Sequence, residues 1–247
     1  MELSPEQSLA LAVDTPDLHE ADRLASVAKD AGLVIIKEGL ELLYVANPAA
    51  MSDVASINEL AWLADFKTRA TPKTMEPAIR SMVDLDYPPL GITVSTDSGV
   101  ESIRLAQEIA DEKGIIIFGV GHLSTIGQVE TRKYSRAAPT SLMRSEANRG
   151  YDAGLRGFVF SGEDLPLLRH NEHLEELINM VVGTRSEGVI IEGDDQKRVT
   201  TIYDAVLNGA DLIEIGRQAT NASNPELALR IAAQEIENAR NARSSAS

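Results

Sequence analysis

The chain has 247 residues, of which 43% are hydrophobic and 25% are charged, and these fractions are typical of globular proteins rather than disordered chains. It contains no cysteine, which excludes disulfides, thiol catalysis and cysteine-ligated metal clusters, and its four histidines form no HExxH zinc motif. The net charge of −15 opposes binding to nucleic acids. An anionic ligand would therefore need a basic site that is built locally, against the overall field of the protein.

Short apolar runs alternate along the chain with longer segments of helical periodicity. Each run is bounded by Gly, Asp or Ser and has the length of a buried strand. Between the runs, apolar residues recur at three- and four-residue spacing, and several of these segments stop at a glycine, as helices do. The eight runs, in chain order, are residues 9–13 (LALAV), 33–37 (LVIIK), 62–67 (WLADFK), 90–95 (LGITVS), 115–121 (IIIFGVG), 157–161 (GFVFS), 178–183 (INMVVG) and 212–216 (LIEIG).

Eight strand-then-helix units in 247 residues predict an α/β fold, a (β/α)8 TIM barrel that occupies residues 1–247 as a single domain. An open doubly wound sheet would have the same alternation, but no GxGxxG motif follows the first run, which disfavours its dinucleotide-binding form. The N-terminal sequence MELSPEQSLALAVD has neither a basic start nor a long apolar run. We therefore expect a cytoplasmic protein with no signal peptide and no membrane anchor.

Polar and charged residues gather where the predicted strands end, which is where the active sites of such barrels lie. They are Asp14, Lys37, Asp65, Lys67, Ser95, Asp97, His122, Ser124, Arg185 and Arg217. Asp65 and Lys67 are two residues apart on one strand, so their side chains point to the same face, and Lys37 ends the preceding strand. A lysine held beside a carboxylate can donate a proton to a carbanion, although an ordinary surface ion pair would have the same pattern.

The last two predicted strands end in glycine and arginine, a combination suited to phosphate. The seventh run ends in Gly183 and is followed by Thr184 and Arg185, and the eighth run ends in Gly216 and is followed by Arg217. Glycine lets the backbone approach an anion, and the arginine guanidinium fits phosphate oxygens. The connection SEGVIIEGDDQKR after Arg185 is long enough to be a lid, and it carries Gln196 near its end. A solvated loop that holds basic residues by chance is the simpler alternative.

These motifs resemble those of the orotidine 5′-phosphate decarboxylase family, and the resemblance runs over almost the whole chain. LALAVD, which ends at Asp14, is similar to the family's LALDVD, and Lys37 matches a lysine at the end of the family's second strand. Residues 65–74, DFKTRATPKT, resemble the family signature DxKxxDIPxT. VGTRSEGVIIEGDDQKR and GADLIEIGRQAT resemble the family's PGIRPxG…GDQKR and GADYxVxGRPIT.

The resemblance implies a homodimeric barrel that decarboxylates orotidine monophosphate, a nucleoside monophosphate, to uridine monophosphate without a metal or another cofactor. Lys67 would protonate the C6 carbanion, Asp65 would lie against the leaving carboxylate, and Lys37 would join the charged groups to the ribose. The other implied substrate-binding residues are Asp14 for the ribose, Thr74 for the ribose in the partner subunit, Ser124 in the segment that reads the pyrimidine, and Gly183, Arg185, Gln196, Gly216 and Arg217 for the phosphate.

One position departs from the family signature in a way that bears on the reaction. The second aspartate of DxKxxD is Ala70 here, so Lys67 lacks one of the carboxylates that the family places near it. The neighbouring Arg69 adds a cation that either serves a different anionic substrate or faces solvent. Three functions stay open: a divergent decarboxylase of orotidine monophosphate, a related sugar-phosphate decarboxylase or aldolase, and a catalytically weak paralogue that only binds a nucleotide or sugar phosphate.

Overall fold

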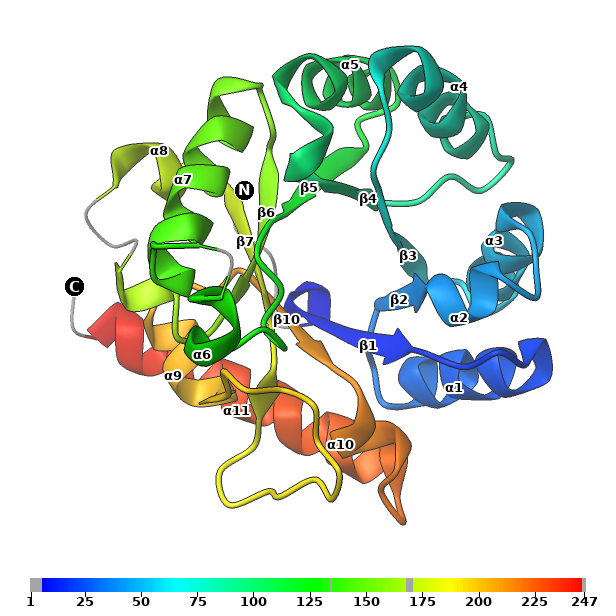
Figure 1. Cartoon of the computed structure of the whole chain (residues 1–247). Coiled ribbons are helices and arrows are strands. Elements are labelled where there is room, and N and C mark those ends of the chain that lie inside the picture. Colours follow the sequence, from blue (N-terminus) through cyan, green and yellow to red (C-terminus); the bar gives the residue numbers. More distant parts are fainter. Residues whose placement is uncertain (1–5, 134, 168–170, 246–247) are drawn as a thin grey trace.

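Eight parallel strands close into a barrel in the computed structural model of the chain, which describes residues 6–133, 135–167 and 171–245 (Figure 1). Each barrel strand pairs with the next one along the chain, and the last pairs with the first. The predicted (β/α)8 barrel is therefore confirmed, with small differences in where its strands begin and end. The barrel strands are β1 Leu9–Val13, β2 Ile35–Gly39, β3 Ala61–Thr68, β4 Gly91–Ser95, β5 Ile116–Val120, β6 Gly157–Ser161, β7 Ile178–Val182 and β10 Leu212–Ile215.

Helices cover the outside of the barrel, and several begin at a side-chain cap or a proline. The Asp17 carboxylate accepts hydrogen bonds from two N–H groups at the start of α1, and Pro72 opens α4. Within the described ranges, no helix is both long enough and apolar enough to cross a bilayer. The helices are η1 Glu6–Ser8, α1 Leu18–Asp30, α2 Leu40–Leu43, α3 Pro48–Ile57, α4 Pro72–Val83, η2 Thr96–Ser98, α5 Val100–Asp111, α6 Gln128–Thr131, α7 Pro139–Asp152, η3 Leu165–Leu167, α8 Glu172–Glu175, α9 Ile202–Leu207, α10 Arg217–Thr220 and α11 Pro225–Ser245.

A small two-stranded sheet lies outside the barrel, where the sequence predicted only a long connection. Its strands, β8 Thr184–Arg185 and β9 Thr200–Thr201, pair in parallel. They bring together the two ends of segment 186–199, the long yellow loop of Figure 1. Strands of two residues have no measurable periodicity, so the pattern of apolar residues could not indicate them.

Alternating side chains along the strands separate the core into two apolar layers. One layer packs between the strands and the helices and contains Leu9, Leu11 and Val13 of β1. The second layer fills the interior of the barrel with Ala10, Ile35, Leu63, Phe118, Met180 and Leu212. The residue two positions after each interior residue also points inward, one layer nearer the C-terminal ends of the strands. The interior cluster therefore lies directly beneath any site at the C-terminal ends of the strands.

Glu38 of β2 is an exception to the apolar composition of the buried layers. Its side chain is fully buried, and neither carboxyl oxygen has a hydrogen-bond partner. Burial raises the pKa of Glu38 from its ordinary value of 4.5 to about 8. The side chain is therefore protonated in the folded protein at neutral pH.

We expect Glu38 to make folding stability pH-dependent. Above pH 4.5 the carboxyl group ionises in the unfolded chain but keeps its proton in the folded protein, so unfolding releases a proton. The contribution of Glu38 to the free energy of unfolding should then fall by at most about 1.4 kcal/mol per pH unit until pH reaches about 8, where it levels off. Urea denaturation from pH 5 to 9 measures this slope.

Glu38→Gln should flatten that slope, because an amide does not titrate in this range. Glu108→Gln, a change on the exposed surface of α5, serves as the control and should keep the slope of the wild type. Equal slopes for Glu38→Gln and the wild type would show that the buried carboxyl group does not titrate as described.

Candidate active site

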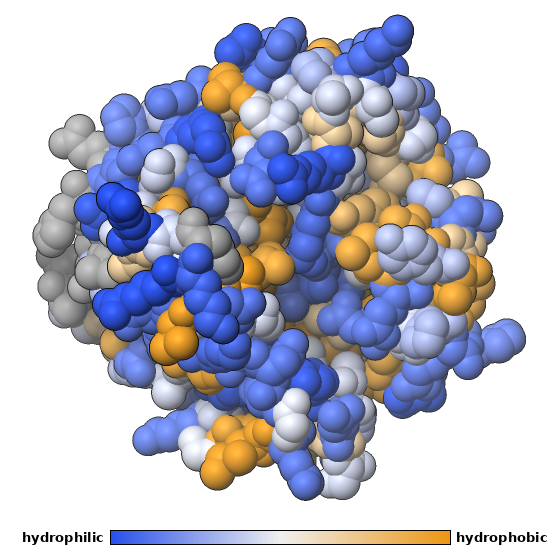
Figure 2. All heavy atoms as spheres, viewed as in Figure 1, coloured by the Kyte–Doolittle hydropathy of each residue, from blue (hydrophilic) through white to orange (hydrophobic). Residues whose placement is uncertain are grey.

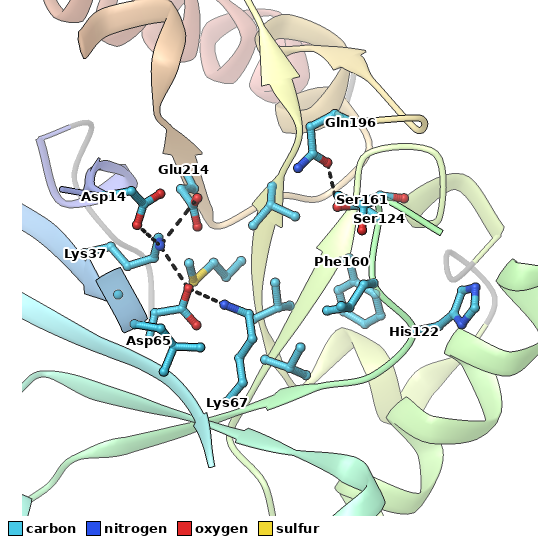
Figure 3. A pocket seen from close by; sticks show the side chains of 18 of the residues that line it. Asp14, Lys37, Asp65, Lys67, His122, Ser124, Phe160, Ser161, Gln196 and Glu214 are labelled. Atoms are coloured by element: carbon cyan, nitrogen blue, oxygen red, sulfur yellow. Dashed lines mark hydrogen bonds and ion pairs between the residues drawn. The ribbon is translucent and has the colours of Figure 1, made fainter. Parts of the chain in front are cut away.

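A cavity of about 330 Å³ opens at the C-terminal ends of the barrel strands. Apolar side chains of β5, β6 and β7, including Val120, Val159 and Met180, form one wall. Charged residues of β2, β3 and β10, together with Asp14 directly after β1, form the other. On the face shown in Figure 2, hydrophilic residues line a central hollow that is flanked by hydrophobic residues. Figure 3 shows the charged side chains converging in the cavity. This mixed lining suits a ligand that carries both a flat apolar part and charged groups.

Asp65 links the two predicted lysines through a single oxygen atom. Its Oδ2 accepts hydrogen bonds from Lys37 Nζ at 2.9 Å and from Lys67 Nζ at 2.7 Å (Figure 3). Lys37 and Asp65 are buried, whereas the Lys67 side chain is 38% exposed. Burial by itself would raise the pKa of Asp65, but Lys37 and Lys67 outweigh it and hold that pKa well below its usual value. Asp65 is therefore ionised, and Lys67 alone of the three presents its charge to the open cavity.

Thr93 of β4, which no motif in the sequence indicated, fixes this arrangement. Its hydroxyl donates to Asp65 Oδ1 at 2.8 Å and accepts a hydrogen bond from the Lys67 N–H at 2.8 Å. Lys67 has a φ of 47°, in the left-handed region that non-glycine residues rarely adopt, and the register between β3 and β4 shifts between Ala64 and Thr68. Such a backbone conformation costs about 1 kcal/mol or more, and the hydrogen bond to Thr93 offsets part of that cost.

Two further carboxyl groups surround Lys37. Asp14 Oδ1 lies 3.4 Å from Lys37 Nζ, and Glu214 Oε1 of β10 lies 3.7 Å away. Burial would lower the pKa of Lys37, but Asp65, Glu214 and Asp14 together raise it well above its usual value. Gly39 leaves room for Asp14, since a Cβ there would lie 2.8 Å from Asp14 Oδ1. Asp14 thus lies beside Lys37 at the rim of the cavity, and Glu214, which no motif in the sequence indicated, lies there as well.

The predicted phosphate-binding residues lie together around a second cavity of about 330 Å³. Gly183, Arg185, Gln196, Gly216 and Arg217 all line it. Gly183 has a φ of +72°, and a Cβ there would lie 3.2 Å from Gln196 Oε1, so both backbone and space favour glycine. This second cavity adjoins the first, and residues shared by both include Asp14, Gln196 and Glu214.

Ser124 and Gln196 meet across the rim of the first cavity. The Ser124 hydroxyl donates to Gln196 Oε1 at 2.6 Å, so two residues that are far apart in sequence join the end of β5 to segment 186–199 (Figure 3). His122, another polar residue near the end of β5, also lines the cavity, but its Nε2 is 2.9 Å from Thr131 Oγ1 and its ring points away from the lysines. Ser124 is therefore the better placed of the two to contact a ligand near Lys67.

Both phosphate-end arginines are paired with acidic residues of segment 186–199. Arg185 Nη2 lies 2.7 Å from Asp194 Oδ2, and Arg217 Nη2 lies 2.8 Å from Asp194 Oδ1. Arg217 also forms an ion pair with Asp195. Burial would raise the pKa of Asp194, but the N–H of Gln196 and the two arginines lower it. Asp194 thus bridges the two arginines, whereas Asp195 is an exposed second partner of Arg217 alone.

Both ends of segment 186–199 are held to the barrel. At its start, the Ser186 N–H donates to Gln218 Oε1 at 2.8 Å, and Gln218 Nε2 donates to Ser186 Oγ at 2.6 Å. At its end, the buried Arg198 pairs with the buried Asp164 at 2.7 Å and donates to the carbonyl of His122 at 3.2 Å. Arg198 therefore anchors the segment from below and does not line the phosphate-end cavity.

Three residues of the predicted signature region lie outside the cavities. Thr74 is exposed on α4, and its hydroxyl is 3.5 Å from that of Thr71. Arg69 is 68% exposed and lies 3.7 Å from Asp97, so its guanidinium faces solvent. Ala70 packs against the outer apolar layer. Among the residues that the structure describes, no group of three His, Asp or Glu side chains is arranged to hold a metal ion.

Comparisons with known proteins agree on one family. The model of the orotidine 5′-phosphate decarboxylase / HUMPS family matches residues 7–232. The chain is 31% identical over 230 residues to the orotidine 5′-phosphate decarboxylase of Thermobifida fusca, covering 93% of this chain and 95% of the relative. It is 32% identical over 230 residues to the enzyme of that name from Methylococcus capsulatus, covering 92% and 91% of the two chains.

Solved structures show the same fold. The crystal structure of orotidine 5′-phosphate decarboxylase from Lactobacillus acidophilus superposes with a TM-score of 0.77 at 20% identity and covers 93% of this chain and 98% of that one. The structure of orotidine 5′-monophosphate decarboxylase from Methanocaldococcus jannaschii, complexed with the inhibitor BMP, gives a TM-score of 0.71 at 19% identity and covers 93% and 98%.

Removing the carboxylate of Asp195 should strengthen anion binding, because an incoming phosphate has to compete with Asp195 for Arg217. An exposed ion pair of this kind is worth about 0.2–1 kcal/mol, so we expect Asp195→Asn to bind inorganic phosphate up to about fivefold more tightly than the wild type. Isothermal titration calorimetry measures the dissociation constant. Asp53→Asn, on the exposed face of α3, makes the same change in net charge and should bind phosphate as the wild type does. Unchanged affinity in Asp195→Asn would mean that phosphate does not displace this carboxylate.

Proposed function

Because the chain belongs to the orotidine 5′-phosphate decarboxylase / HUMPS family, we propose that it is a carboxy-lyase that converts orotidine monophosphate to uridine monophosphate in pyrimidine biosynthesis. The observation that carries this proposal is that Lys37 and Lys67 share the Asp65 carboxylate. Their cavity adjoins a second, arginine-lined cavity that suits phosphate. The reaction needs a proton donor and a negative charge at one end of the substrate and an anchor for the phosphate at the other.

Lys67 is the proton donor in this mechanism. The bond between C6 and the carboxylate carbon breaks, carbon dioxide leaves, and the electron pair stays on C6. The Lys67 ammonium group then gives its proton to C6, and the resulting amine takes a proton back from solvent, to which the side chain is open. Asp65, which is ionised, lies beside Lys67 and repels the substrate carboxylate until that group leaves as neutral carbon dioxide.

The phosphate end supplies binding energy away from the reacting carbon. Arg185 and Arg217 would hold the phosphate oxygens, and Gly183 and Gly216 would let the backbone approach them. Gln196 lines both cavities and accepts a hydrogen bond from Ser124, so it would connect a bound phosphate to the pyrimidine end of the site. Interactions with this remote group help to hold the substrate carboxylate against Asp65.

We also propose that the protein is a cytoplasmic homodimer and that residues 1–247 form one domain. Thr74 is exposed and lies outside the cavities, so a second copy of the chain would be needed to bring it to a ligand. Tyr44 and Val45, which follow the cavity-lining helix α2, are 83% and 58% exposed, and Figure 2 shows hydrophobic residues over α2 and α3. An apolar surface beside the site supports an interface there.

A paralogue that binds a nucleotide without turning it over is the second candidate. Ala70 favours it, because this position has no carboxylate to add to the Lys37, Asp65 and Lys67 cluster. The retained lysines and Asp65 favour catalysis instead, since binding alone does not require two ammonium groups on one buried carboxylate. The assay below separates the two functions.

The purified protein should remove the orotate absorbance of orotidine monophosphate, and Lys67→Ala should lower kcat by about 100- to 10,000-fold, the usual contribution of a general acid. Lys73→Ala, which removes an exposed lysine of α4, serves as the control and should keep kcat. No turnover by the wild type, together with equal binding of uridine monophosphate to the wild type and Lys67→Ala, would instead identify a non-catalytic paralogue.

Thr93→Val should lower kcat with little change in KM, because Thr93 orients Asp65 and the Lys67 backbone without lining the cavity. The hydrogen bond to ionised Asp65 is worth about 1.5–3 kcal/mol, which corresponds to a loss in kcat of roughly 10- to 100-fold. Thr93→Ser keeps the hydroxyl and should recover most of the rate at a similar Tm. Equal kcat values for Thr93→Val and the wild type would rule out this positioning role.

A further inference from the structure

Glu214 occupies a central position that the proposed mechanism does not use. It follows Leu212 of the interior cluster by two residues on β10, so its side chain enters the site from the barrel interior. The side chain is 17% exposed and lines both the cavity that contains Lys67 and the phosphate-end cavity. Any ligand that reaches from Arg217 to Lys67 therefore passes Glu214.

The carboxyl oxygens of Glu214 are available to such a ligand. Glu214 Oε1 is 3.7 Å from Lys37 Nζ, which is beyond hydrogen-bonding distance, and the bonds from Lys37 go to Asp65 and Asp14. No side chain in the described part of the chain donates a hydrogen bond to the Glu214 carboxyl group, whereas its backbone carbonyl accepts one from the Thr184 hydroxyl. A partly buried acceptor that faces a cavity in this way favours a ligand that can donate to it.

The position of Glu214 indicates which part of the ligand it contacts. In a nucleoside monophosphate the pentose joins the phosphate to the base, and its free hydroxyl groups are hydrogen-bond donors. Asp14 and Glu214 lie on either side of Lys37 at the junction of the two cavities, where such a pentose would lie (Figure 3). Carboxyl groups at this point accept from hydroxyl groups, whereas they would repel a second phosphate.

We propose that Glu214 is a substrate-binding residue that accepts a hydrogen bond from a pentose hydroxyl and thereby selects nucleotides that carry this hydroxyl over the analogues that lack it. This inference rests on the proposed function, because it takes the ligand to be a nucleoside monophosphate. It assigns to β10 a specificity role in addition to the phosphate-end role of Gly216 and Arg217, which follow that strand.

Binding of three nucleotides tests the proposal: uridine monophosphate and its 2′-deoxy and 3′-deoxy analogues. For the wild type, we expect about tenfold or more weaker binding of the analogue that lacks the contacted hydroxyl. In Glu214→Val that ratio of dissociation constants should fall close to one, mainly through loss of affinity for uridine monophosphate. In Glu214→Gln, whose amide oxygen still accepts, part of the ratio should remain.

The ratio within one variant does not depend on what fraction of the preparation is folded, so partial misfolding cannot mimic the result. Glu108→Gln, on the exposed surface of α5, should keep the ratio of the wild type. An unchanged ratio for both analogues in Glu214→Val, in a protein whose wild type decarboxylates orotidine monophosphate, would overturn this inference and leave the proposed function intact. A wild type that binds none of the three nucleotides would overturn both.

Discussion

The Asp65 carboxylate stabilises the site because it binds two ammonium groups at a buried position. Removing one partner of such a buried pair leaves an uncompensated charge and costs about 3–5 kcal/mol. The other features of the site follow from this requirement. Thr93 donates to the second oxygen of Asp65, and the unusual backbone of Lys67 brings its ammonium group to the first. Asp65, together with Glu214 and Asp14, keeps Lys37 charged despite its burial.

The sequence predicts most of the fold because each barrel strand is an apolar run and each run has a charged or polar end. It also predicts Lys37, Asp65 and Lys67 as neighbours, since residues two apart on a strand share a face and parallel strands end at one rim. Thr93 and Glu214 were missed because both lie inside apolar runs, where a single polar residue gives no pattern. The alternation of side chains along a strand could have indicated Glu214. It follows the interior Leu212 by two residues, so its charged side chain has to face the site.

Segment 186–199 shows a different limit of sequence reasoning. Its length and its glycine residues predict a connection over the site, but the partners of its acidic residues depend on where the arginines of other strands lie in space. Asp194 bridges Arg185 and Arg217. Arg198, two residues after Gln196, pairs instead with the buried Asp164. A protein of net charge −15 thus concentrates cations at one rim by giving each of them a carboxylate neighbour.

The anchoring of segment 186–199 at both ends determines how it can move. A segment that is anchored at both ends is most mobile in its middle and least mobile next to its anchors. Gln196 lies two residues from the clamp at Arg198 and is tied to Ser124, whereas Ile190, near the middle, is 92% exposed. Gln196 is therefore held by its own bond to Ser124 and by the nearby Arg198–Asp164 pair, so its amide is fixed more firmly than the exposed middle of the segment.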